Sequence, residues 1–341
     1  MRGGVRESDV LKIGYKASAE QFGPEQLLAY ALEAERRGFD SVAVSDHFQP
    51  FRHTGGHAPA ALPWLGALAV QSSRIRFGTS VSTPTMRFHP SMMAQAFATI
   101  AQLAPGRVWM GVGTGESLNE VPPLGIEWPK FSERLSRLQE SIDLMRRLWT
   151  EERVSFQGRW YRTVNATVYD RPGQPVPILI AAAGARAARF AGAAGDGYIT
   201  TSGKPRELYT ETLLPALAEG AREAGREPPA ERLLEVKVSY EADHARAVAE
   251  CAFWAVLALP AEDKQGVDDP LELERLAAEE HVHAESRFIC TGDPDELCDL
   301  VAPYVDLGFR HLVFHSPAPD QSRFLQLFAD EALPRLRSRF G

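Results

Sequence analysis

The stretch LKIGYKASAEQFGPEQLLAYALEAERRGFDSVAV, residues 11–44, contains one complete strand–helix–strand unit. Its apolar run at 11–15 predicts a first strand, and the run SVAV at 41–44 predicts a second. Between them, Pro24 stands where a helix favours its first residue, and Gly38 stands where a helix commonly ends. Apolar residues recur at helical spacing between these two positions, so an amphipathic helix is expected to connect two buried strands.

The same unit repeats along the chain. Further short apolar runs, each followed by a segment with helical spacing, predict strands at 75–81, 108–112, 176–180, 198–200, 234–240 and 311–315. Eight such alternations favour a closed parallel barrel over an open sheet. We therefore expect an α/β fold, a single (β/α)8 TIM barrel domain over residues 1–341. Two insertions are expected, a hairpin near 151–170 and a polar, partly helical segment near 259–290.

Composition excludes several function classes. The chain has 37 lysines and arginines against 45 aspartates and glutamates, so its net charge is −8, which argues against binding to nucleic acid or an anionic membrane surface. The apolar runs are shorter than the ~18 residues that a membrane span needs. Cys251, Cys290 and Cys298 lack the number and spacing of a disulfide framework. No apolar segment follows the first arginines, so no signal peptide is expected, and a cytoplasmic protein is predicted.

Barrel enzymes place their reactive groups where the strands end, so the residues that follow the predicted strands are the candidates for chemistry. Asp46-His47 follows the second strand, where a histidine is suited to proton transfer because its usual pKa lies near neutrality. A capping aspartate and an ordinary loop histidine explain the same pair. The remaining histidines do not cluster on several strand ends, so no metal site is expected.

Glycines and small residues follow the fourth and fifth strands. GVGTGE at 111–116 permits the backbone to approach a ligand, but it is not a dinucleotide fingerprint, because Glu116 replaces the third glycine and no helix is expected to open there. AAAG at 181–184 precedes a helix, whose free N–H groups could bind phosphate. Tight packing of that helix on its strand explains the small residues equally well.

Longer motifs resemble one known family. The strings are GYKASAEQF (14–22), VSDHFQP (44–50), GGHAP (55–59), TSVSTPT (79–85), AQAFAT (94–99), GVGTGESLNE (111–120), AGDGYITTSGK (194–204) and HLVFHSPAPDQ (311–321). They are similar to those of the coenzyme F420-dependent glucose-6-phosphate dehydrogenases, which belong to the luciferase-like superfamily of (β/α)8 barrels. The resemblance runs from about Lys12 to Phe340.

The resemblance implies a reaction and a set of site residues. The coenzyme is F420, an 8-hydroxy-5-deazaflavin that carries hydride, and the substrate is a sugar 6-phosphate, with glucose-6-phosphate first, oxidised at the anomeric carbon to 6-phosphogluconolactone. The implied coenzyme contacts are Asp46, Ser80, Val81, Thr83, Thr114, Gly115, Asn119, Ala182, Ala183 and Gly184, with a cis peptide bond at Ser80-Val81. The implied catalytic groups are His47 as base, with Glu116 and Glu20. The implied substrate contacts are Phe51, Thr201, Lys204, Lys264 and Arg287, and a homodimer is expected.

Three positions depart from the family's pattern. Phe51 replaces a tryptophan and loses its indole N–H donor, so fructose-6-phosphate or mannose-6-phosphate is also a candidate substrate. Ala183-Gly184 replaces a pair of glycines, and Gln265 replaces a histidine. Two other functions remain as alternatives. One is a luciferase-like monooxygenase that uses reduced FMN, which has no need of the cations Lys204, Lys264 and Arg287. The other is a non-catalytic carrier, which has no need of His47 and Glu116.

Overall fold

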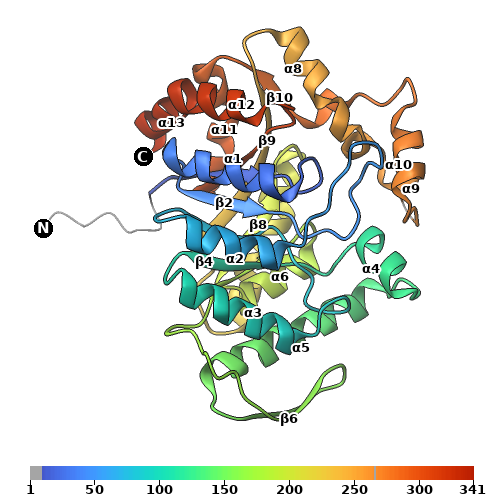
Figure 1. The fold of residues 1–341 in the computed structure, drawn as a ribbon, viewed down its shortest axis with the longest axis vertical. Coiled ribbons are helices and arrows are strands. Elements are labelled where there is room, and N and C mark those ends of the chain that lie inside the picture. Colours follow the sequence, from blue (N-terminus) through green and yellow to red (C-terminus); the bar gives the residue numbers. More distant parts are fainter. Residues whose placement is uncertain (1–9, 265) are drawn as a thin grey trace, which may run out of the picture.

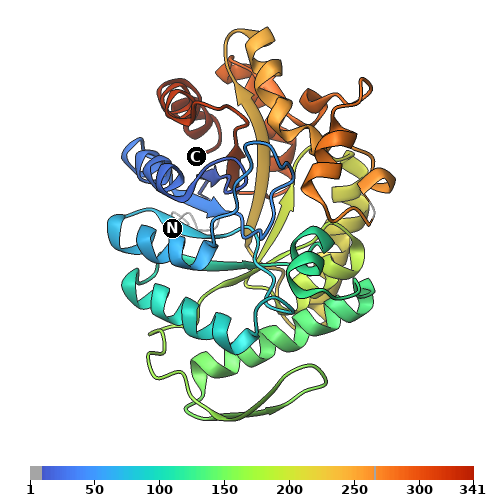
Figure 2. The ribbon, with the colours of Figure 1, turned by 45° about the vertical axis from the view of Figure 1, so that its right-hand side comes forward.

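The computed structural model describes residues 10–264 and 266–341, so Gln265 lies outside the described residues. Eight parallel strands pair in a closed ring, which confirms the predicted barrel (Figures 1 and 2). In ring order they are β1 (Lys12–Ala17), β2 (Ser41–Val44), β3 (Arg76–Thr79), β4 (Val108–Val112), β7 (Ile178–Ala181), β8 (Gly197–Thr201), β9 (Glu231–Tyr240) and β11 (His311–His315). The apolar character of these strands follows from burial on both faces.

Helices surround the barrel. They are α1 (Pro24–Arg36), α2 (Ala61–Gln71), α3 (Pro90–Leu103), α5 (Phe131–Thr150), α6 (Ala185–Ala194), α7 (Leu214–Glu223), α8 (His244–Glu250), α11 (Pro294–Asp306), α12 (Gln321–Leu327) and α13 (Leu333–Phe340). Helix α1 packs against α2, α2 against α3 and α3 against α5, and α12 returns to α1 on the other side (Figure 1). The helical layer therefore follows the same closed order as the strands.

The connections differ from the sequence-based expectation at two places. The third strand ends at Thr79, two residues short of its predicted end, and the peptide bond between Ser80 and Val81 that follows it is cis. A short helix α4 (Ser117–Leu124) begins directly after Glu116, where no helix was expected. Pro122 and Pro123 inside it argue against a helix by propensity, and it ends at Gly125, which takes a left-handed conformation.

Two insertions interrupt the regular order. The first is an antiparallel pair, β5 (Val154–Gln157) and β6 (Arg162–Ala166). The second runs from the 3-10 helix η3 (Cys251–Ala258) through α9 (Ala261–Lys264), α10 (Pro270–Ala277) and η4 (Ala284–Arg287). It ends in β10 (Ile289–Thr291), which pairs with the last residues of β9 and was not foreseen.

A polar network closes the barrel at the N-terminal ends of its strands. The imidazole of His311 contacts Glu231 through Nδ1 at 2.7 Å and the Ser41 hydroxyl through Nε2 at 2.6 Å, and Lys12 donates to Glu231 at 2.8 Å. An apolar layer lies inside the barrel, made of Ala43, Trp109, Leu179, Ile199, Leu233 and Val313. Because this end is filled, a ligand can enter the barrel only from the C-terminal ends of the strands.

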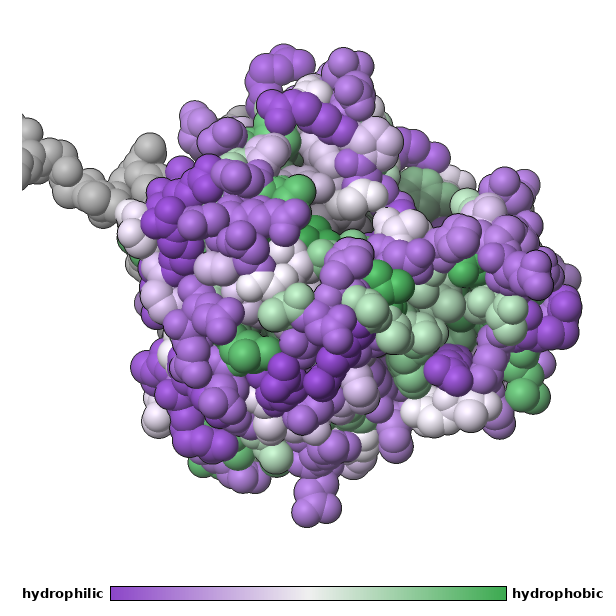
Figure 3. Space-filling view, turned by 90° about the horizontal axis from the view of Figure 1, so that it is seen from above, coloured by the Kyte–Doolittle hydropathy of each residue, from purple (hydrophilic) through white to green (hydrophobic). Residues whose placement is uncertain are grey.

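The face of the molecule seen in Figure 3 is mainly hydrophilic. Figure 3, seen from above, shows an apolar area toward the side on which Figure 1 places α9 and α10. Across residues 10–264 and 266–341, no helix combines the length and the apolar character that crossing a membrane requires.

Replacing Gly111 with alanine is expected to lower the free energy of unfolding by about 1–3 kcal/mol, the usual cost of overpacking a core. The new Cβ would collide with the carbonyl oxygen of Thr79 on the neighbouring strand β3. Gly66→Ala in α2 is the matched control, because nothing lies within 4 Å of its new Cβ, and it should stabilise the helix slightly. Urea denaturation of both variants measures the difference. Equal stabilities would contradict the close packing of β3 on β4.

Candidate active site

A cavity of about 470 Å³ opens where the barrel strands end. Every residue predicted to contact the coenzyme lines it, as do His47, Glu116 and Thr201. Glu20, Phe51, Lys204, Lys264 and Arg287 lie outside this lining. The closed barrel thus brings residues from β2, β3, β4, β7 and β8 onto one cavity, although they are far apart in the sequence.

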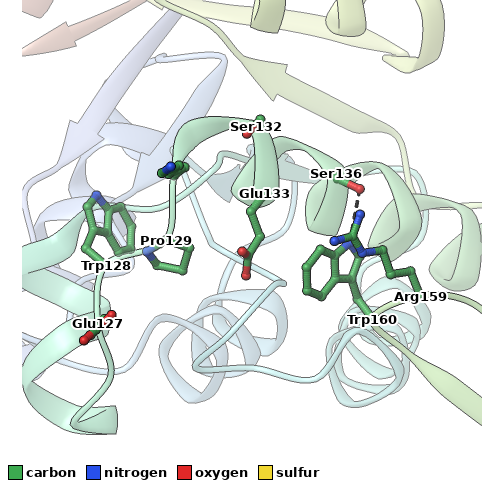
Figure 4. A pocket seen from close by; sticks show the side chains of 9 residues that line it. Glu127, Trp128, Pro129, Ser132, Glu133, Ser136, Arg159 and Trp160 are labelled. Atoms are coloured by element: carbon green, nitrogen blue, oxygen red, sulfur yellow. Dashed lines mark hydrogen bonds between the residues drawn. The ribbon is translucent and has the colours of Figure 1, made fainter.

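A second cavity of about 530 Å³ lies outside the barrel, between α5 and the β5–β6 hairpin (Figure 4). It is lined by Trp128, Glu133 and Arg159 among others, and the indole N–H of Trp160 donates to the Ser136 hydroxyl at 3.1 Å. None of its lining residues stands at the end of a barrel strand. The smaller cavity at the strand ends is therefore the better candidate for chemistry, although it is not the larger of the two.

His47 stands between two carboxylates. Its Nδ1 lies 2.9 Å from Oε1 of Glu20, close enough for an ion pair when the ring is protonated. Its Nε2 lies 3.9 Å from Oε2 of Glu116. Glu20 is buried and its other oxygen accepts from the Ser45 hydroxyl at 2.7 Å, whereas the Glu116 side chain is 54% exposed. One ring nitrogen is therefore held by a fixed carboxylate and the other faces the cavity.

The two carboxylates change the proton affinity of the imidazole. Burial alone would lower the pKa of His47, but the charge of Glu20, and to a smaller degree that of Glu116, outweighs burial and raises it. Burial likewise disfavours the charged form of Glu20, yet the contacts with His47, Lys16 and Ser45 hold the pKa of Glu20 at about 2. Glu20 is thus ionised at neutral pH, and its charge makes the neutral imidazole of His47 a stronger proton acceptor.

Replacing Glu20 with glutamine is expected to lower the pKa of His47. The substitution keeps the shape of the side chain and removes the charge that most favours the imidazolium, so more of the ring becomes neutral at pH 7. NMR titration of the His47 ring measures the shift. Glu116→Gln is the control and should lower the pKa less, because Glu116 is farther away and solvated. An unchanged pKa after Glu20→Gln would contradict the pairing.

The coenzyme-side residues include a carboxylate without a hydrogen-bond partner. Both oxygens of Asp46 are buried and neither is hydrogen-bonded, although Arg87 approaches one of them to 3.5 Å. Asn119 accepts from the backbone N–H groups of Phe48 and Gln49 at 2.7 and 3.1 Å, so it fixes the loop that carries His47. A buried carboxylate facing a cavity is suited to accept a hydrogen bond from a ligand.

Other residues of the cavity lining are small or apolar. Val81 and Ile199 contribute apolar side chains to the cavity. Helix α6 begins after Gly184, and no side chain caps its first turn, so its N–H groups remain available to an anion. Open space surrounds the position where a Cβ would stand on Gly184.

Three cations lie close enough to act on one another; Lys204, Lys264 and Arg287 are called the cation group below. Burial lowers the pKa of Lys264, and the charges of Arg287 and Lys204 lower it further, while Glu116 opposes them. Burial and the charge of Arg287 also lower the pKa of Lys204. The Nε atom of Arg287 is buried without a hydrogen-bond partner. Like charges gathered in this way favour an anionic ligand.

Phe51 lies between His47, the predicted base, and Trp254 of the second insertion. Its ring meets the His47 ring edge-on at 5.2 Å and lies 6.5 Å from Trp254 of η3. Trp254 in turn packs on His315 at 4.5 Å and donates to the Gln21 side chain at 3.0 Å. The aromatic ring therefore contacts the proposed base directly.

A buried ionic network beneath the cavity was missed from sequence. Lys16 and Lys237 lie 3.2 and 3.1 Å from the two oxygens of Glu235, which lines the cavity, and Lys16 also donates to the carbonyl of Ser80 at 2.7 Å. A signal was present, because Glu235 and Lys237 flank the apolar Val236 in β9 and therefore point to the same face of the strand. Among the described residues, no three His, Cys, Asp or Glu side chains are grouped so that they could hold a metal ion.

Comparisons with known proteins agree on one family. The sequence model of luciferase-like monooxygenases matches residues 10–311. An F420-dependent glucose-6-phosphate dehydrogenase of Nakamurella multipartita is 57% identical over 333 residues, covering 97% of this chain and 98% of that protein. One from Segniliparus rotundus is 55% identical over 330 residues, covering 96% and 98%. A solved F420-dependent secondary alcohol dehydrogenase, in complex with an F420–acetone adduct, has a TM-score of 0.89 at 33% identity, covering 96% and 99%.

Proposed function

This chain belongs to the F420-dependent glucose-6-phosphate dehydrogenases, within the luciferase-like family, and on that premise we propose that it oxidises glucose-6-phosphate at the anomeric carbon. The observation that carries the proposal is the position of Glu116, whose charge acts on His47 on one side and on Lys264 on the other. The charge of Glu116 therefore links a proton acceptor in the cavity to a cation outside its lining. A sugar phosphate needs both.

Coenzyme F420 fits the residues of the cavity. The unpartnered carboxylate of Asp46 can accept a hydrogen bond, and the uncapped N-terminus of α6 after Gly184 can receive a phosphate. Val81, Thr83 and Asn119 would complete the contacts. When bound, the deazaflavin supplies a carbon that accepts hydride from the sugar. The chain's own residues orient the two partners and move the proton.

His47 is the proposed base. Nε2, which faces the cavity, takes the proton of the anomeric hydroxyl as the hydride leaves, and the carboxylate of Glu20 stabilises the resulting imidazolium through Nδ1. The raised pKa of His47 supports this role, because a raised pKa makes the neutral imidazole a stronger proton acceptor. Glu116 is proposed to protonate the coenzyme ring or to orient the sugar.

The cation group is proposed to bind the phosphate of the sugar, with Thr201 beside it. The phosphate carries nearly two negative charges at neutral pH, and charge-assisted hydrogen bonds from two ammonium groups and a guanidinium offset them. The unpartnered Nε of Arg287 supports this assignment. A strongly local positive field also explains how a protein of net charge −8 can bind an anion.

The proposal is tested by mixing the protein with oxidised F420 and following the loss of its visible absorbance. Glucose-6-phosphate, fructose-6-phosphate, mannose-6-phosphate and unphosphorylated glucose are compared at equal concentration. Bleaching with glucose-6-phosphate but not with glucose is expected, and the ranking of the phosphates shows how Phe51 affects sugar choice. Absence of bleaching with every phosphate would overturn the proposal, and oxygen uptake with reduced FMN would then be measured.

A homodimer is proposed on the family resemblance alone. The cytoplasmic location and the single barrel domain with two insertions over residues 1–341 stay predictions from the sequence pattern. Light scattering of the purified protein tests the dimer.

A further inference from the structure

Two of the three cysteines face each other at the two ends of the second insertion. Cys251 opens η3, and Cys290 lies in β10, thirty-nine positions later. Their sulfur atoms are 3.8 Å apart, and both thiols are free. A disulfide needs sulfur atoms about 2.05 Å apart, so a modest side-chain movement would bring them into bonding distance.

The two thiols differ in surroundings. Cys251 is fully buried, and its thiol donates to the carbonyl of Ala247 at 3.3 Å. Cys290 is half-buried and lines an open cavity of about 420 Å³, together with His244 and Asp293. A small oxidant in solvent can therefore reach Cys290 but not Cys251.

We propose that Cys251 and Cys290 form a reversible dithiol–disulfide site that a peroxide oxidises through Cys290. In the first step Cys290 loses its proton, the resulting thiolate forms an S–O bond as the O–O bond of the peroxide breaks, and the departing hydroxide takes up that released proton to become water. In the second step the sulfur of Cys251 forms the S–S bond as the S–O bond breaks, and a second water leaves with the Cys251 proton. Two electrons pass from the sulfurs to the peroxide.

The pKa values of the two thiols favour the same order of oxidation, with Cys290 reacting before Cys251. Contact with Cys251 lowers the pKa of Cys290 against the effects of burial, Glu285 and Glu250. Contact with Cys290, together with burial, raises the pKa of Cys251. The thiolate, which is the nucleophile, therefore forms on the accessible cysteine.

The bond would tie together the two ends of the segment that carries Lys264 and Arg287. Arg287 lies three residues before Cys290, and η3 packs against η4. Closing the segment into a covalent loop restricts its opening. That consequence concerns the segment itself and holds whichever ligand the cation group binds.

The test treats the folded, full-length protein with hydrogen peroxide and then counts free thiols and measures mass. The expected result is a fall from three free thiols to one, a mass loss of two hydrogen atoms, and recovery of both values with dithiothreitol. A peptide map should join Cys251 to Cys290. Amide hydrogen exchange across 252–289 should slow in the oxidised form.

Single serine variants separate the possible outcomes. Cys251→Ser and Cys290→Ser should each abolish disulfide formation, and Cys251→Ser should leave Cys290 oxidised to its sulfenic or sulfinic acid. Cys298→Ser is the matched control, because Cys298 is buried in α11, and it should oxidise as the parent does. Absence of the Cys251–Cys290 peptide, or a disulfide that includes Cys298, would overturn the site. Unchanged exchange in 252–289 would overturn its effect on the insertion. None of these readouts depends on dehydrogenase activity.

Discussion

Replacing His47 with alanine is expected to lower kcat about 10²–10⁴-fold, the usual contribution of a general base. The dissociation constant for F420 should remain unchanged, because the coenzyme contacts proposed at Asp46 and α6 stay intact. Stopped-flow reduction of F420 by glucose-6-phosphate measures the first quantity, and a fluorescence titration measures the second.

Two further measurements distinguish a base from a merely structural residue. Added imidazole should restore part of the lost turnover, because a small base can enter the space that the side chain leaves. His53→Ala is the control, since His53 is an exposed histidine of the same loop, and it should behave as the parent protein. A loss of less than about tenfold in His47→Ala, or a loss that imidazole does not rescue, would refute the assigned role.

Replacing Lys264 with alanine should raise the KM for glucose-6-phosphate about 10- to 100-fold, which corresponds to roughly 1.5–3 kcal/mol for a hydrogen bond to a charged group. The expected cause is the loss of one of three cations that offset the phosphate charge. F420 binding should not change, because Lys264 lies outside the coenzyme cavity. Steady-state kinetics with each substrate varied in turn measure both values.

Lys130→Ala is the matched control, because Lys130 lines only the outer cavity beside α5. Inorganic phosphate should compete with the sugar phosphate in the parent and more weakly in Lys264→Ala. An unchanged KM, with competition as strong as in the parent, would remove Lys264 from the phosphate-binding residues.

The regular part of the fold could be predicted from the sequence. Each strand of the barrel is a short apolar run, and each helix has an apolar stripe, so local periodicity identifies them one by one. Local rules failed at α4, where Pro122 and Pro123 argue against a helix that the packing of Leu118 and Asn119 nevertheless maintains. They also failed at β10, because three residues carry too little pattern to be recognised as a strand.

Some residues of the candidate site could also be predicted from the sequence, and others could not. Residues that follow strands in recognisable motifs, such as His47 and Glu116, could be selected from the sequence, because a barrel always brings its strand ends to one face. The sequence alone therefore determined the barrel and the motifs at its strand ends, since both depend on local pattern. Only the tertiary structure decided that Lys204, Lys264 and Arg287 act on one another, that Lys16 and Lys237 share Glu235, and that Cys251 faces Cys290. These relations join residues from separate segments, and their distances depend on how the barrel closes and how the insertion folds back on it.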